Sequence, residues 1–212
     1  MKISRTRRTL DLNLLGTIDS CDIVIRLSQE VNERLRDDPS FKELYDRARA
    51  AIHFFLQRND GGDAWWVEAK IRAGLNEVYS MEDAARRAFR LSARVSKPPK
   101  LSDSPHPLVQ MMYCLRNINV HVKPMLTERR DVSVRFADAE IRQDFTYGAV
   151  MLTDDVLNDV LGNGDVKKNY SASEMRDALV WLLENQKIFG VGQVFKVGVD
   201  RYCNEVLAAL QP

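Results

Sequence analysis

One short segment, residues 115–121 (Leu-Arg-Asn-Ile-Asn-Val-His), combines side chains that act together on phosphates. The guanidinium of Arg116 can hold a phosphate through two charge-assisted hydrogen bonds and stabilise the negative charge that develops on it. The imidazole of His121 can take up or release a proton near neutral pH. Arg116, His121 and the intervening Asn117 are therefore candidate catalytic residues for chemistry at a phosphate.

A single helix is expected to carry these three residues. It should begin beside Pro107, run to about residue 122 and stop before Pro124, because proline disfavours the helical conformation in the residue ahead of it. A five-residue step turns about 140° and rises about 7.5 Å, so Arg116 must lean round the helix to reach a phosphate at His121. Asn117 and His121 share a face. The helix dipole favours a protonated His121 in the last turn.

A structural role explains the same residues without catalysis. In that alternative Arg116 pairs with an acidic side chain of the bundle, and His121 caps the helix end through its ring. A second pair with a similar spacing, Arg47 and His53 with five residues between them instead of four, has Ala48 after the arginine and lies among apolar residues. We expect this second pair to be structural or simply exposed.

The Arg-Asn-x-x-x-His segment resembles the signature of the HEPN family, in which an arginine, usually followed by a polar residue, precedes a histidine by a short spacer. The resemblance covers Arg116, Asn117, His121 and their position after two long helical segments. It implies an α-helical bundle and a metal-independent endoribonuclease that needs no cofactor. Attack by the ribose 2′-hydroxyl would restrict cleavage to RNA.

The same resemblance implies partners. These are an RNA substrate, a second copy of the chain, and an antitoxin or regulatory protein in a toxin-antitoxin or antiviral defence setting. HEPN toxins silenced by a nucleotidyltransferase carry a tyrosine two positions after the histidine, where this chain has Lys123. Silencing by tyrosine modification at that place is therefore not expected. The alternative function is a catalytically inactive HEPN-like module that binds RNA, a nucleotide or a partner protein.

A homodimer is expected because proton transfer to and from two oxygens is best served by two histidines. Neither His53 nor His106, which stands in a proline loop, is a convincing second carrier. Some apolar residues of the motif helix could form the contact between copies, namely Leu108, Met111, Met112 and Leu115.

A basic stretch lies upstream, without an acid from residue 84 to residue 100. Its candidate RNA-binding residues are Arg86, Arg87, Arg90 and Arg94, because phosphate contacts set affinity without reading sequence. Composition alone favours a solvated helix face. The smaller basic cluster at Arg5, Arg7 and Arg8 is expected to be a solvated end.

Two further features have competing interpretations. Trp65 and Trp66 could stack on bases, although burial in the core or in a dimer interface is favoured for such large rings. No metal site is expected, because the acidic residues that could be assembled into one lack an ordered spacing, these being Asp154, Asp155, Asp159 and Asp165.

The elements around these residues are predicted to be mainly helical in a single domain, residues 1–212, with residues 131–170 as a β-hairpin and loop insertion. Apolar residues recur at helical spacing over residues 17–36, 40–55, 63–95, 107–122 and 171–183. Ser80 and Asp83 offer a cap at which the third of these helices can break. Residues 132–152 suggest two short strands or a hairpin, followed by a short helix at 154–161.

Composition limits the remaining function classes. With 45% hydrophobic and 29% charged residues in 212, the chain is of globular type. Lys+Arg 31 against Asp+Glu 30 removes bulk positive charge as an argument for nucleic-acid binding. The three cysteines form neither a disulfide framework nor a zinc site, which favours a cytoplasmic location. No apolar run is long enough to span a membrane.

Overall fold

The computed structural model describes residues 8–16, 27–56, 64–92, 97–117, 124–135 and 142–210. Helices dominate these ranges, which confirms the prediction of a mainly α protein. Among the helices described, none has both the length and the apolar character required to cross a membrane.

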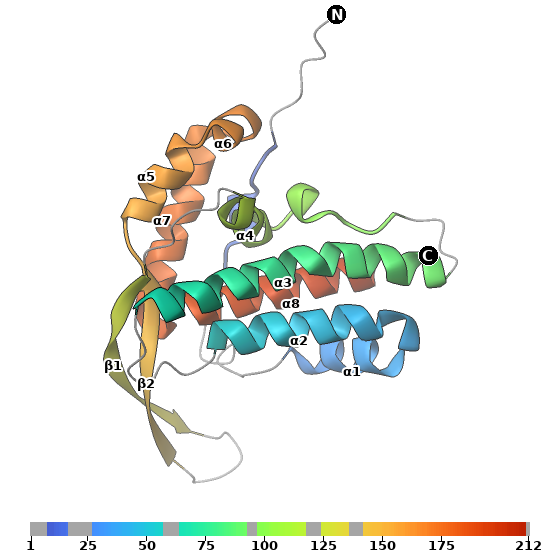
Figure 1. Cartoon of the computed structure of the whole chain (residues 1–212), viewed down its shortest axis with the longest axis horizontal. Helices are drawn as coiled ribbons and strands as arrows, with labels where there is room; N and C mark the ends of the chain where they lie inside the picture. The colour runs from blue at the N-terminus through green and yellow to red at the C-terminus, as the bar shows by residue number, and fades with distance from the viewer. Residues whose placement is uncertain are drawn as a thin grey trace, which may run out of the picture.

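Long helices packed side by side form the centre of the fold (Figure 1). α2 (Lys42–Leu56) packs against both α3 (Ala64–Leu91) and α8 (Val191–Ala208), and α1 (Gln29–Asp37) packs against α2. The buried face of α2 repeats at helical spacing, as the sequence predicts. The last turn of α2 packs closely against α3, because the Phe55 ring occupies the space where a Cβ of Gly74 would lie.

α4 (Pro107–Asn117) lies above α3 and is seen nearly end-on in Figure 1. Proline suits its first position, since that backbone nitrogen needs no helical partner. The Nδ1 atom of His106 accepts a hydrogen bond from the Leu108 backbone N–H at 3.3 Å and caps the start of the helix. α4 is described as far as Asn117, so the predicted continuation to residue 122 lies outside the described residues.

Two strands follow α4. β1 (Pro124–Arg135) and β2 (Arg142–Leu152) pair antiparallel, with Pro124 opposite Leu152 and Arg135 opposite Arg142. β1 therefore begins well before residue 132, where the strand pattern was expected to start. The segment Glu128-Arg129-Arg130-Asp131 hides this strand in the sequence, because four charged residues in a row break the apolar-polar alternation.

The C-terminal part is helical up to residue 208. α5 (Asp155–Gly162) confirms the predicted short helix, and α6 (Gly164–Asn169) occupies a stretch that was expected to be loop. α7 (Ala172–Phe189) packs against α8, and Gly190, with a φ of 83°, separates the two helices. Short 3-10 turns complete the fold at η1 (Leu12–Leu14), η3 (Pro39–Phe41) and η4 (Leu101–Asp103).

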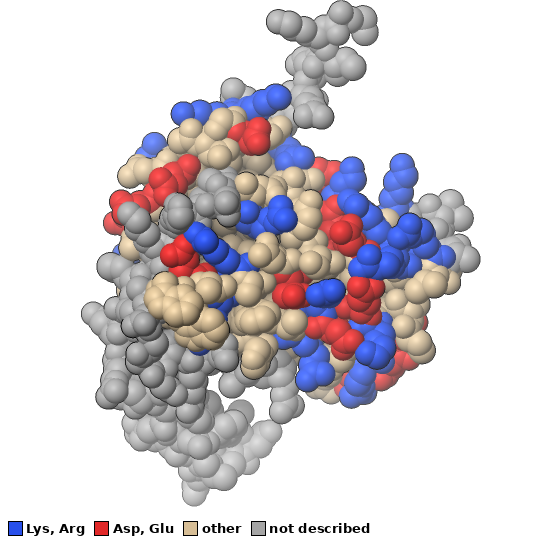
Figure 2. All heavy atoms as spheres, in the orientation of Figure 1, with Lys and Arg blue, Asp and Glu red and all other residues tan. Residues whose placement is uncertain are grey.

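The face of the molecule formed by α2 and α3 shows two kinds of surface (Figure 2). Basic and acidic side chains are interspersed over the right-hand part, and less charged surface lies nearer the middle. In the same view, α3 runs across the front from left to right (Figure 1).

Candidate functional site

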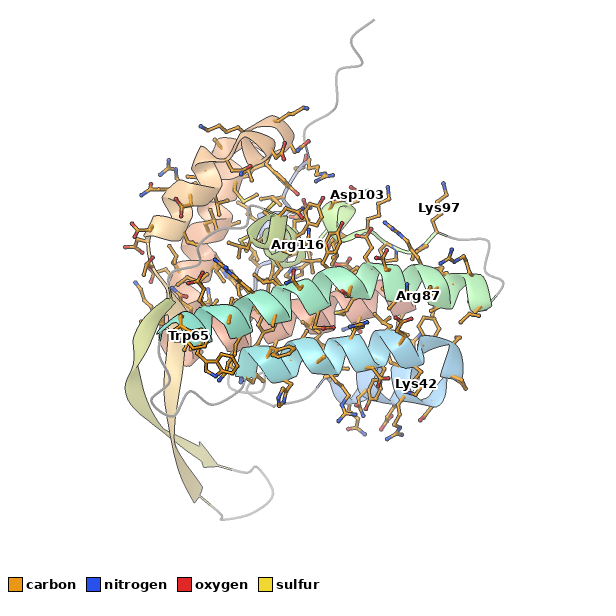
Figure 3. The ribbon with its side chains drawn as sticks, viewed as in Figure 1. Lys42, Trp65, Arg87, Lys97, Asp103 and Arg116 are labelled. Carbon is orange, nitrogen blue, oxygen red and sulfur yellow. The ribbon has the colours of Figure 1, made fainter. Side chains whose placement is uncertain are left out.

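Arg116 lies in the last turn of α4, beside α3 (Figure 3). Its guanidinium carbon is 3.9 Å from the centre of the Tyr79 ring of α3. Its Nη1 atom donates a hydrogen bond to Oδ1 of Asn117 at 3.0 Å. None of the ion pairs found among the described residues includes Arg116. In that part of the chain, its partner is a ring rather than the bundle acid of the structural alternative.

Stacking on a ring has a different effect from pairing with a carboxylate. The Tyr79 ring attracts the guanidinium through its π face and restricts its plane. It brings no negative charge, and the N–H groups lie in the guanidinium plane and point outward from its edge. Arg116 therefore keeps both the charge and the geometry needed for a bidentate contact with a phosphate.

Tyr79 belongs to a larger set of rings and guanidiniums, which we call the ring-guanidinium cluster: Arg8, Tyr79, Tyr113, Arg116 and Tyr170. The Tyr79 and Tyr113 rings stack with centroids 6.4 Å apart. The Arg8 guanidinium carbon lies 5.9 Å from the Tyr113 ring and 5.7 Å from the Tyr170 ring. The cluster thus connects the N-terminal segment, α3, α4 and the end of α6.

Arg8 is not the solvated end that the sequence suggested. Its Nη1 atom donates to the Tyr170 hydroxyl at 3.3 Å, and its Nε atom lies 3.7 Å from Asp103. Burial raises the pKa of Tyr170, so this phenol stays neutral. Its partners come from distant parts of the chain, and local composition carries no signal for them.

His121, the predicted proton carrier, lies outside the described residues, as does Lys123. Asn117 is exposed at the end of α4 and orients Arg116 through the hydrogen bond given above. The structure therefore brings together two of the three predicted catalytic residues, and adds Tyr79, which sequence reasoning missed.

The second Arg/His pair has a different environment. Arg47 Nη1 lies 3.0 Å from Oε2 of Glu77 on α3. His53 is exposed near the end of α2, with its ring against the edge of Phe54. An arginine held by a carboxylate, with the histidine on open surface, is the arrangement that the sequence favoured for this pair.

The basic stretch on α3 is largely paired. Arg86 forms ion pairs with Glu82 and Asp83, which directly precede the stretch in the sequence. The Nε atom of Arg87 donates to Glu43 of α2 at 2.7 Å, and this hydrogen bond lowers the pKa of the Glu43 carboxyl. The number of basic residues from residue 84 to residue 100 therefore overstates the positive charge that is available to a ligand.

The other two arginines of that stretch differ in what the structure describes. Arg90 is exposed on α3, and Arg94 lies outside the described residues.

The two tryptophans are not buried in the core, so that part of the prediction is wrong, and burial in a dimer interface stays a prediction. Trp65 is 64% exposed and Trp66 is 47% exposed, and their rings contact each other edge to face at 5.4 Å. The ammonium of Lys70 lies 5.5 Å from the Trp66 ring centre. Both tryptophans lie in the first turn of α3, ahead of Val67, which is buried in the core. Their exposure makes a stacking role on bases available.

The apolar residues proposed for the dimer contact are also placed differently. All four are buried within the chain's own core: Leu108, Met111, Met112 and Leu115. A contact between copies must therefore use another surface. The sequence could not distinguish the two cases, because an apolar side chain packs equally well in a core or an interface.

His106 is a structural residue. Burial, assisted by the positive charge of Arg201, lowers its pKa to about 4. It stays neutral while its Nδ1 atom caps α4, which makes it a poor proton donor. Among the described residues, no group of histidine, cysteine and acidic side chains is arranged to hold a metal ion.

No family model, no curated protein and no solved structure matches this chain. Its function has to be inferred from its own residues. The described part of the site offers an oriented, charged arginine on an aromatic surface, which suits recognition of a phosphate beside a base.

Proposed function

We propose that this protein is a HEPN-like, metal-independent endoribonuclease that cleaves RNA through attack of the ribose 2′-hydroxyl on the adjacent phosphate. Arg116 binds the phosphate that is cleaved, and His121 transfers the proton. One observation carries the proposal: Arg116 stacks on Tyr79 without an ion-pair partner among the described residues, at the point of the chain that leads to His121.

The state of Arg116 matters because the transition state gains negative charge. A guanidinium already neutralised by a carboxylate would have to exchange that partner before it could stabilise the phosphate. A guanidinium on a ring is oriented beforehand and needs no such exchange. Asn117 contributes to this orientation by accepting a hydrogen bond from Arg116 Nη1 at 3.0 Å.

The reaction also requires a second proton carrier. One proton leaves the 2′-hydroxyl and another must reach the departing 5′-oxygen. His106 is buried with a pKa lowered to about 4, and His53 is exposed on α2, where the arginine of its pair, Arg47, is held by Glu77. The second carrier in this proposal is His121 of another copy, placed opposite the first by a two-fold axis.

This shared site has a consequence for activity on dilution. At micromolar concentration, sedimentation should give about twice the 24.3 kDa mass of one chain, and specific activity should fall below the dimer dissociation constant. Undiminished specific activity of a monomer would refute the shared site, even if the protein cleaves RNA.

The second candidate function is an inactive HEPN-like module that uses the same surface for recognition only. The observation in its favour is the ring-guanidinium cluster together with the exposed Trp65, which can bind RNA without any proton carrier. The two candidates differ at His121, because its replacement by alanine removes cleavage but leaves recognition intact.

The biological setting in this proposal comes from the HEPN resemblance alone. It comprises a toxin or defence effector in the cytoplasm, with an antitoxin or regulatory protein as its partner.

The decisive experiment incubates the purified protein with mixed RNA in the presence of EDTA. The expected products are fragments that end in a 2′,3′-cyclic phosphate, which the 2′-hydroxyl mechanism produces directly. A product with a 3′-hydroxyl end, or cleavage that EDTA abolishes, would contradict the proposed mechanism.

A further inference from the structure

The sequence of α3 contains an internal repeat with a spacing of fourteen residues. The pattern aromatic-x-x-Glu-x-x-x-Arg occurs twice, as Trp65, Glu68 and Arg72 and again as Tyr79, Glu82 and Arg86. Fourteen residues of an α-helix advance about 21 Å and return to within about 40° of the starting direction. The two units therefore face the same side of α3.

This shared face requires a continuous helix, and α3 is continuous. The break that the sequence allowed at Ser80 does not occur, since α3 extends from Ala64 to Leu91. The Ser80 hydroxyl instead donates to the Asn76 carbonyl oxygen at 2.9 Å, within the helix. The face from Trp65 to Arg86 therefore lies on one unbroken helix.

In both units the glutamate holds its arginine from the inner side. The Arg72 side chain is 37% exposed against 22% for Glu68, and Arg86 is 47% exposed against 12% for Glu82. A carboxylate oxygen of Glu82 also accepts the Leu101 backbone N–H at 2.9 Å. The carboxylates thus lie deeper than the guanidiniums, which form the outer surface.

The rings of the two units differ in accessibility. Trp65 is 64% exposed, whereas Tyr79 is 36% exposed and carries the Arg116 guanidinium on its ring. In Figure 3, Trp65 lies near the start of α3, and Arg116 lies beside the middle of the same helix. Along this face a ring alternates with a guanidinium about every 10.5 Å, at every seventh residue.

We propose that this face of α3, from Trp65 to Arg86, binds a single-stranded RNA lying along the helix. A base stacks on Trp65 while the phosphate to be cleaved lies at Arg116, and the strand passes over the ion-paired Glu68 and Arg72 between them. The assignment of the cleaved phosphate to Arg116 rests on the proposed ribonuclease function.

Single-stranded RNA fits this face better than a duplex or a protein does. Exposed rings stack on unpaired bases, whose faces a duplex hides between neighbouring pairs. The Arg116 guanidinium, at the Tyr79 end of the face, suits the phosphate that such a strand carries between its bases. A protein interface of similar size is typically depleted of charge at its centre, whereas this face carries a charged residue between its two rings.

The proposal has a consequence for substrate length. Only a strand that spans the roughly 21 Å from Tyr79, where Arg116 lies, to Trp65 can use both the phosphate site and the Trp65 ring. Removing the Trp65 ring should therefore weaken the binding of a long oligonucleotide and leave a dinucleotide unaffected.

The test measures the binding of fluorescently labelled oligouridine by anisotropy. The His121→Ala protein serves as the background, so that no cleavage occurs. Trp65→Ala should weaken binding of the long strand by about 5- to 150-fold, the range expected for one stacked base, and Trp65→Phe should recover most of the affinity. Recovery by phenylalanine separates stacking from misfolding.

The matched control is Leu91→Ala, which removes a 74% exposed apolar side chain at the far end of the helix. It should not weaken binding as Trp65→Ala does. Unchanged RNA binding by Trp65→Ala overturns the proposal. If the variant binds RNA normally but no longer self-associates, the Trp65 ring serves a contact between copies, and the proposal is overturned as well. Equal Trp65 dependence for duplex RNA also overturns it.

Failure of the ribonuclease proposal would look different. If the wild-type protein binds the long strand with Trp65 dependence but never cleaves it, the binding face is supported and the catalytic assignment is refuted. If it cleaves RNA and Trp65→Ala changes neither KM nor binding, the catalytic assignment stands and the binding face is refuted.

Discussion

Two arginines that lie against α3 show how differently the protein uses the same side chain. Arg87, in the C-terminal half of α3, is held by Glu43, whose pKa falls as a result. Arg116, beside the middle of α3, is held by the face of Tyr79. The first arrangement belongs to the part of the surface where acidic and basic side chains are interspersed (Figure 2). Only the second leaves the charge of the arginine available to a ligand.

The two Arg/His pairs make the same point at nearly equal sequence spacing, five positions for Arg116 and His121 and six for Arg47 and His53. Arg47 has a carboxylate partner at 3.0 Å, and Arg116 has an aromatic one at 3.9 Å. Spacing in the sequence therefore does not identify a phosphate site, since the partner of the arginine decides whether its charge is available. The predictions below test this difference.

The largest effect is expected at the candidate catalytic pair. Arg116→Ala and His121→Ala should each lower the rate of RNA cleavage by about 100- to 10,000-fold while the fold remains intact, because each removes a group that acts in the transition state. Single-turnover cleavage and circular dichroism measure the two quantities. Arg47→Ala and His53→Ala are the matched controls and should cleave like the wild type. Wild-type cleavage by a folded Arg116→Ala protein would remove the basis of the comparison.

Glu205, a carboxylate with no cation partner among the described residues, should behave in the opposite way to Glu43. Burial raises the pKa of Glu205 to about 7, although a hydrogen bond from Ser104 at 2.6 Å acts against this rise. Between about pH 4.5 and about pH 7 the folded protein binds a proton that the unfolded chain lacks. The Glu205 contribution to the free energy of unfolding must therefore fall as the pH rises through this range.

Glu205→Gln should remove this dependence, because glutamine keeps the oxygen that accepts from Ser104 but never ionises. Relative to the wild type, the variant should gain about 1–3 kcal/mol between pH 5 and pH 8, measured by urea unfolding. His106, with its pKa lowered to about 4, contributes the opposite slope between about pH 4 and about pH 6.5, and taking the difference between the two proteins cancels it. An equal slope in both proteins would contradict the assignment.

A smaller effect is expected at Tyr79. Replacement by leucine removes the ring under Arg116 and should lower kcat by about 2- to 5-fold, the range of an exposed cation–π contact. Tyr79→Phe keeps the ring and should cleave at the wild-type rate. If the Tyr79 hydroxyl were the important group, this variant would be as slow as Tyr79→Leu. The pH profile should keep its shape in both variants, since Tyr79 positions Arg116 and transfers no proton.

The smallest effect concerns the salt dependence of RNA binding. Removing one cation that binds a phosphate of a single strand should reduce the slope of log K against log salt by about 0.7. We expect this reduction for Arg116→Ala and a smaller one for Arg87→Ala, because Arg87 is already paired with Glu43. Charge reversal at Arg86, Arg87, Arg90 and Arg94 together should flatten the slope further without destroying cleavage at saturating RNA. Equal slopes for Arg87→Ala and Arg116→Ala would end the distinction between the two arginines.

Much of the helical structure could be predicted from the sequence. The apolar period of α2 and the prolines ahead of α4 are local signals, and each indicated an element of the right type. The start of β1 was missed because its charged segment has no strand pattern. Its place is set by backbone pairing with β2, which depends little on side-chain type.

In the candidate site, too, some features could be predicted from the sequence and others depended on tertiary packing. Residue identity and spacing alone singled out Arg116, Asn117 and His121, because guanidinium and imidazole chemistry belongs to the side chains themselves. Which arginine meets a carboxylate and which meets a ring was decided only by tertiary structure. Glu43 is 44 residues away from Arg87 in the chain, and Tyr79 reaches Arg116 from a different helix. Such partners come together only when helices pack, so no local pattern in the sequence can encode them.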